Sequence, residues 1–133
     1  MHIIVYGTLK SGYGNNRLLS NSKKVADCIV RGYKLYNSGF PVAVPDANSQ
    51  IMGEVWEIEP EKTLRSLDSL EGCRGEGPEN YGMYYRQRVV AFTDEGQIEG
   101  QMYVGHPESW HQYKGLRECP IDDTVGAYRW ERY

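Results

Sequence analysis

Cysteine is scarce in this sequence, and its distribution excludes a disulfide scaffold. The 133-residue chain holds three cysteines, Cys28, Cys73 and Cys119, which are widely spaced and form no CxxC pair. An odd number of isolated cysteines is typical of a reducing compartment, and their spacing argues against structural zinc. At this length, folding buries roughly two-thirds of the unfolded surface. We therefore expect one self-supporting domain over residues 1–133.

Long hydrophobic runs and clustered positive charges are also missing. The longest apolar run is only a few residues, and no hydrophobic region follows a charged N-terminus. The sequence therefore predicts neither a membrane span nor a secretory signal. The net charge is -3, and the 15 lysines and arginines are scattered singly, which argues against a nucleic-acid binder. We expect a cytoplasmic monomer or homodimer that binds neither membranes nor nucleic acid.

Motifs for metal binding and for nucleophilic catalysis are absent. His2, His106 and His111 show no HExxH or i, i+4 pairing and no neighbouring Cys or Asp cluster, so we predict no metal site. No serine stands in a GxSxG motif, and Cys73 has no neighbouring histidine to activate it. The sequence therefore argues against a covalent nucleophile, and we expect no cofactor.

Tyrosine and strand-forming segments are what the sequence has in quantity. Eleven tyrosines stand against two phenylalanines, and we expect several to line a polar cavity because each carries a hydroxyl that needs a partner. After residue 105 no period is evident, and we expect this part to wrap around the body. A helix is predicted over 60–71, and the order indicates an α+β fold with a small mixed barrel-like sheet and one or two helices. Strands are predicted at 2–6, 28–36, 38–45, 50–59, 83–93 and 97–105.

A glutamate lies on the apolar side of the predicted helix. With about 100° per residue, Glu71 falls inside the stripe made by Leu64, Leu67 and Leu70, whereas Asp68 marks its edge. Burial and the negative end of the helix dipole should both raise the pKa of Glu71, which suits general acid and base work. The alternative is that the last turn frays before Gly72 and the side chain reaches water.

The first strand is followed by a glycine-rich stretch. Gly7, Gly12 and Gly14 give the backbone freedom of φ, so several N–H groups can point at an anion such as a carboxylate or phosphate. The stretch matches neither a Walker nor a Rossmann motif. Taken alone, such a stretch is more often a plain surface turn.

Loop and helix belong to a longer series of segments, which are, in chain order, "VYGTLK", "RGYKLYNSGFPVAVP", "GEVWEIEPEKTLRSLDSLEG" and "MYYRQRVV". They combine a YGTL loop after the first strand, an LDxLEG helix end and a YxR strand start. Together these segments, from residue 3 to about residue 104, resemble the γ-glutamylcyclotransferase-like family, in particular its γ-glutamylamine cyclotransferase and AIG2-like branch.

The resemblance implies the fold, the reaction and the site. It implies a barrel-like α+β fold with a cavity at the end of the first strand, and Glu71 as the catalytic residue. The family's substrate-binding residues carry over onto Tyr6, Gly7, Thr8, Leu9, Tyr84 and Tyr103. In the implied reaction the α-amine of a γ-glutamyl amine or peptide attacks its own γ-carbonyl, giving 5-oxoproline and a free amine.

Two questions stay open at this stage. The pocket could instead belong to a binding or regulatory module for a small carboxylate ligand, because a fold alone does not establish function; the γ-glutamyl group could also sit on a larger metabolite or protein. The link "CRGEGPENYGM", residues 73–83, is longer than we associate with the amine-specific branch. We predict that it is a mobile flap without regular structure that covers the leaving-group side.

Overall fold

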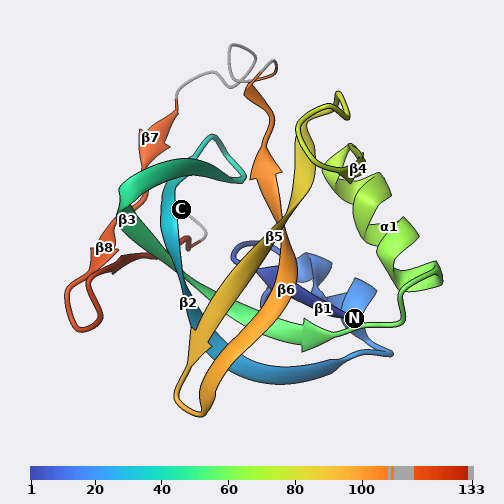
Figure 1. The fold of residues 1–133 in the computed structure, drawn as a ribbon, viewed down its shortest axis with the longest axis horizontal. Coiled ribbons are helices and arrows are strands. Elements are labelled where there is room, and N and C mark those ends of the chain that lie inside the picture. The colour runs from blue at the N-terminus through green and yellow to red at the C-terminus, as the bar shows by residue number, and fades with distance from the viewer. Residues whose placement is uncertain (108, 110–115, 132–133) are drawn as a thin grey trace.

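Five strands close into a barrel in the computed structural model of the protein, which describes residues 1–107, 109 and 116–131 (Figure 1). The hydrogen-bonded order is β2, β5, β6, β1, β3 and back to β2, and only the contact between β1 and β6 is parallel within this ring. The predicted α+β fold with a mixed barrel-like sheet is therefore confirmed. The strands are β1 (His2–Val5), β2 (Lys23–Asn37), β3 (Pro41–Glu57), β5 (Tyr84–Thr93) and β6 (Gly96–Gly105).

β2 and β3 form one long hairpin. The single strand β3 takes the place of the two strands that the sequence predicted at 38–45 and 50–59. Between the pairs Tyr33–Pro45 and Arg31–Gln50 the register shifts, so residues 46–49 bulge opposite Gly32. Gly32 has φ of 91°, a value that favours glycine. The polar residues 46–49 suggested a gap between two strands in the sequence. Because a bulge bends and twists its strand, they instead allow the hairpin to curve around the barrel.

α1 (Lys62–Glu71) stands outside the barrel next to β4 (Figure 1). The helix begins at Lys62, two residues later than predicted, because the carboxylate of Glu59 accepts the backbone N–H groups of Glu61 and Lys62 at 2.8 and 2.9 Å. Its end is at Gly72, as predicted, with φ of 61° in the left-handed region. A short 3₁₀ helix, η1 (Gly14–Leu19), occupies the segment between β1 and β2.

The prediction that residues 73–83 lack regular structure is wrong for their first part. β4 (Cys73–Glu76) pairs in parallel with β5. Alternation did not reveal it because two of its four residues are charged and exposed. The N–H of Gly77 then donates to the Arg86 carbonyl at 2.9 Å, and the N–H of Met83 donates to the Gly72 carbonyl at 3.0 Å. The two ends of the link are thus tied together.

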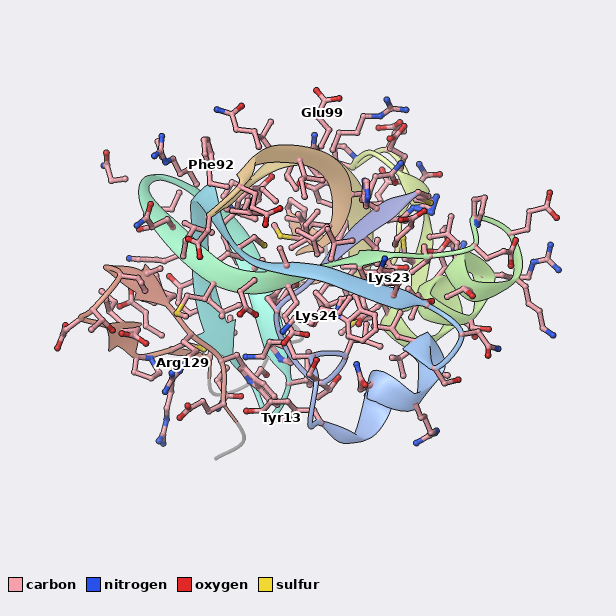
Figure 2. All side chains as sticks on the ribbon, turned by 90° about the horizontal axis from the view of Figure 1, so that it is seen from below. Tyr13, Lys23, Lys24, Phe92, Glu99 and Arg129 are labelled. Carbon is pink, nitrogen blue, oxygen red and sulfur yellow. The ribbon has the colours of Figure 1, made fainter. Side chains whose placement is uncertain are left out.

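The last part of the chain wraps the body, as predicted. β7 (Arg117–Glu118) pairs with β2, β8 (Ile121–Asp122) pairs with β9, and β9 (Ala127–Tyr128) pairs in parallel with β3. Figure 2 shows Arg129, which follows β9, on the same side of the molecule as Tyr13 and opposite Phe92 and Glu99. His111, one of the three predicted non-ligand histidines, lies outside the described residues.

β1 is buried on both of its faces, which explains its continuous apolar sequence. Ile4 packs in one hydrophobic cluster with Val55, whereas Ile3 and Val5 pack in a second cluster with Leu67 of α1. Among the described helices, none is long and apolar enough to cross a membrane. The described residues also contain no group of three potential metal ligands.

Candidate active site

Glu71 is the last residue of α1, and its side chain is half-buried against the barrel. Leu67 is fully buried one turn earlier, as the leucine stripe predicted, but Leu70 is 43% exposed and is not part of the core. Because Gly72 ends the helix immediately, the last turn is capped and intact. Burial raises the pKa of Glu71 to about 7. The carboxyl can therefore change its protonation state near neutral pH.

Two cavities meet at Glu71. The inner cavity is narrow, with a volume of about 20 Å³, and lies at the end of β1. The outer cavity has a volume of about 360 Å³ and is open to solvent. Thr8, Pro41 and Glu71 line both and so stand between them. The other inner residues are Ile4, Val5, Tyr6, Gly7, Leu9 and Tyr103, and the other outer residues are Asn15, Phe40, Ser69, Leu70, Gly72, Met83 and Tyr84.

The loop after β1 contributes Gly7, Thr8 and Leu9 to the lining of the inner cavity. No described residue accepts a hydrogen bond from the N–H of Gly7, Thr8 or Leu9. The Gly7 carbonyl accepts the Lys10 N–H at 2.9 Å. Three consecutive N–H groups that have no acceptor among the described residues, in residues that line a cavity, suit the binding of an anion by the backbone.

The glycines of this loop act differently from the prediction. Gly12 has positive φ, at 89°, whereas Gly7 and Gly14 do not. Gly7 is needed for space, because a Cβ there would come within 2.0 Å of the Pro41 ring. This close approach brings the loop backbone against the wall that separates the two cavities.

Glu54, which sequence reasoning missed, anchors the far end of the loop. Its side chain is buried, and its Oε1 accepts the Ser11 N–H at 2.9 Å and the Trp56 Nε1–H at 3.1 Å. Lys24 Nζ lies 3.4 Å from Oε2 and compensates the charge. The alternation of β3 gave only a weak signal, because Glu54 shares a face with Trp56 and Met52.

The three predicted tyrosines take different positions. Tyr103 lines the inner cavity and Tyr84 the outer one, where its hydroxyl donates to the Pro41 carbonyl at 2.5 Å. The hydroxyl of Tyr6 donates to the Tyr103 carbonyl at 2.7 Å, within the core. Tyr6 therefore lines the inner cavity next to Gly7, while its hydroxyl is hydrogen-bonded to the backbone of β6.

The structure brings all the predicted site residues to the two cavities, although their roles remain predictions. It adds an ion pair that the sequence did not suggest: Arg86 Nη1 lies 3.0 Å from Asp68 Oδ2, one turn before Glu71. The helical wheel had placed Asp68 at the edge of the stripe, and it is indeed half-buried. Arg86 belongs to the YxR segment, but only the fold shows that it reaches α1.

The link of residues 73–83 does not cover either cavity in the described structure. Its neighbour Gly72 and its last residue, Met83, line the outer cavity, whereas residues 73–82 line neither. The middle of the link turns toward β6 instead, where the Pro78 carbonyl lies 2.7 Å from His106 Nε2.

Comparison with known proteins identifies the family. The model of the family described as gamma-glutamyl cyclotransferase, AIG2-like, matches residues 3–128. The gamma-glutamylcyclotransferase family protein YtfP of Escherichia coli (strain K12) is 39% identical over 99 residues, covering 68% of this chain and 86% of the relative. Gamma-glutamylaminecyclotransferase of Rattus norvegicus is 35% identical over 83 residues, covering 54% of this chain and 55% of the relative. A solved structure titled gamma-glutamyl cyclotransferase superposes with a TM-score of 0.62 at 20% identity, covering 90% of this chain and 71% of that one, and shares the fold. The chain therefore belongs to the gamma-glutamyl cyclotransferase, AIG2-like family and is an enzyme of that type.

Proposed function

We propose that this protein converts γ-glutamyl amines or γ-glutamyl peptides to 5-oxoproline and a free amine, with Glu71 as general base and acid. The α-amine nitrogen bonds to the γ-carbonyl carbon, and the bond from that carbon to the leaving nitrogen breaks. The observation that carries the proposal is the placement of Glu71, which is half-buried and lines both cavities. The cyclisation consumes no water and needs no second substrate.

Proton transfer is the work left for the protein. At neutral pH the α-amine is mostly an ammonium ion, so it must lose a proton before it can attack. With a pKa of about 7, Glu71 can accept that proton and later give it to the leaving nitrogen. Holding the amine and the carbonyl in a near-attack geometry supplies on the order of 7 to 11 kcal/mol.

The loop backbone is the proposed site for the substrate's α-carboxylate. The N–H groups of Gly7, Thr8 and Leu9 have no acceptor among the described residues, and all three residues line the inner cavity. Binding the carboxylate there fixes the α-carbon and so directs the adjacent α-amine toward Glu71.

The outer cavity is the proposed site for the leaving amine. Its lining includes Phe40, Leu70 and Met83, and Glu71 is its only acidic or basic side chain among the described residues. Since Glu71 also borders the inner cavity, it can reach both the attacking α-amine nitrogen and the nitrogen of the leaving amine. Tyr84 helps to form this cavity by holding the Pro41 carbonyl.

The first test is the substitution Glu71→Gln, assayed with a panel of γ-glutamyl amines and dipeptides for 5-oxoproline. We expect turnover to fall by roughly 10² or more, because the amide keeps the shape but accepts no proton. Glu61→Gln is the matched control, because it makes the same change at the exposed start of α1. Full activity of folded Glu71→Gln enzyme would refute the assignment.

The second test concerns the loop. Converting the substrate's α-carboxylate to an amide removes the charge that the three N–H groups are proposed to bind, so KM should rise sharply while kcat changes less. An unchanged KM for the amide would show that the carboxylate binds elsewhere.

A further inference from the structure

Three side chains from three elements meet beside Glu71. Asp68 of α1 is paired with Arg86 of β5, and its Oδ1 accepts the hydroxyl of Tyr103 of β6 at 2.7 Å. The Asp68 and Arg86 side chains are only 21% and 13% exposed. Tyr103 is 3% exposed and belongs to the inner cavity. The network thus joins a largely buried ion pair to the wall of the site.

Stability alone gives little reason for this network. Removing two charges from water is expensive, and replacing such a pair by apolar residues is often neutral or stabilising. Arg86 Nε is buried and has no hydrogen-bond partner among the described residues, which adds to the cost. The pair is therefore better explained by what it does to Tyr103 and Glu71.

The direction of the hydrogen bond decides what Tyr103 can offer a substrate. Its only proton is donated to Asp68, so its hydroxyl oxygen has only acceptor capacity left. Burial, followed by the hydrogen bond to Asp68, raises the pKa of Tyr103, and the charge of Glu71 adds to this shift. Tyr103 thus stays neutral near Glu71, and an acceptor there matches the N–H groups of an α-ammonium.

We propose that Asp68 and Arg86 are positioning residues for the reaction: they hold the Tyr103 hydroxyl as an acceptor for the substrate's α-amine, and they cancel each other's charge beside Glu71. The inference rests on the proposed function. Asp68 and Glu71 are three residues apart on one helix, where side chains are neighbours. An unbalanced charge at either member of the pair would therefore act on Glu71.

The sign of that action can be worked out from the groups around Glu71. Burial accounts for the raised pKa of Glu71 in the intact protein, where the pair is neutral. Asp68→Asn leaves the Arg86 cation unpaired, which lowers the pKa of Glu71; Arg86→Gln leaves the Asp68 anion unpaired, which raises it. Among the described residues, the other titratable groups that line the two cavities are Tyr6, Tyr84 and Tyr103, and those of the network next to them are Asp68, Arg86 and Cys73.

The experiment is the pH dependence of kcat/KM for γ-glutamyl-n-butylamide between pH 5 and 9. Glu71 must be ionised to accept the proton, so activity falls on the acidic side with the pKa of Glu71 in the free enzyme. We expect the midpoint of this acidic limb to shift to lower pH by about half to one unit in Asp68→Asn and to higher pH by a similar amount in Arg86→Gln. The double variant should return close to the wild-type position.

Arg88→Gln is the matched control. Arg88 lies two residues further along β5 and pairs with Glu76 of β4, but it is exposed and lines neither cavity of the site. Its loss should leave the acidic limb in place. The inference would be overturned if the acidic limb kept its midpoint pH in both Asp68→Asn and Arg86→Gln, or shifted in the same direction in both. Active Glu71→Gln enzyme would instead refute the proposed function.

A second measurement keeps the test valid if a single charge variant does not fold. Tyr103→Phe removes one hydroxyl and leaves the pair intact. We expect KM for γ-glutamyl-n-butylamide to rise at least tenfold, while inhibition by the N-butyl monoamide of glutaric acid, which lacks the α-amine, stays the same. Equal weakening of both compounds, or of neither, would show that the hydroxyl does not accept from the amine.

Discussion

Glu71 combines burial with a titratable group, so its environment should be visible in folding as well as in catalysis. The pKa of an ordinary glutamate is 4.5, whereas burial raises the pKa of Glu71 to about 7. Between these values the folded protein holds a proton that the unfolded chain has lost. The free energy of unfolding therefore falls as the pH rises through this window, by roughly 3 kcal/mol in all.

Glu71→Gln should accordingly be more stable than the wild type above pH 7 and about equally stable near pH 4. Glutamine has no charge to bury, so the difference in unfolding free energy should grow between those limits and then level off. Urea unfolding followed by circular dichroism at a series of pH values measures it. A difference that is constant from pH 4 to pH 8 would show that Glu71 is not desolvated in the folded state.

At the residue scale, sequence predicted the positions of the site better than the reasons for them. Helical spacing alone placed Glu71 inward, and the structure confirms that position. Gly7, by contrast, was expected to supply backbone freedom, yet it is required by contact with Pro41, 34 residues away (41 − 7). A contact between distant segments leaves no local pattern. The same holds for Arg86 and Asp68, whose pairing depends on how β5 lies against α1.

At the element scale, the ends of the 73–83 link matter more than its middle. Met83, not the turn around Pro78, contacts the outer cavity, together with Leu70 of α1. The selection of the leaving amine should therefore depend on these apolar side chains. This replaces the expectation that a mobile flap chooses the amine.

Met83→Ala should widen the outer cavity and change the ranking of substrates. We expect kcat/KM for a bulky leaving amine to rise relative to that for γ-glutamyl methylamide by roughly 10-fold, because a few methylene groups in an apolar pocket have effects of this size. Val90→Ala is the control, since Val90 lies on β5 at the surface away from both cavities. An unchanged ranking in Met83→Ala would place the leaving group elsewhere.

At the scale of the whole molecule, the sequence predicted strands and their order but not their closure. The strands β1, β5 and β6 were predicted within a residue or two, because their apolar or alternating patterns are strong. The barrel, however, depends on the pairing of β2 with both β3 and β5, and β2 and β3 carry a bulge opposite Gly32 that bends them. The described part of residues 105–133 had no period because it consists of short pieces: β7 and β9 pair with the distant strands β2 and β3, and β8 pairs with β9.

These distant contacts connect the end of the described chain to the site loop. Trp130 is 3% exposed, and its ring lies 5.4 Å from that of Tyr13, centroid to centroid. Lys10 Nζ donates to the Trp130 carbonyl at 2.9 Å, and the Trp130 Nε1–H donates to Asn37 at 3.2 Å. One residue near the end of the described chain therefore holds both the loop after β1 and the end of β2.

Trp130→Ala should for this reason affect stability and substrate binding together. Removing a buried tryptophan side chain costs about 3 to 5 kcal/mol, and the loop loses its aromatic contact with Tyr13. We expect a lower midpoint of thermal unfolding, and below that midpoint a KM raised several-fold with a smaller change in kcat, because the loop is proposed to bind substrate rather than transfer protons. Ile121→Ala is the control from the same part of the chain: its side chain is 49% exposed on β8, so both quantities should stay close to wild type. If Trp130→Ala lowers the unfolding midpoint and leaves KM unchanged, the loop is held by Glu54 and its own turns alone, and the C-terminal contact serves only the barrel.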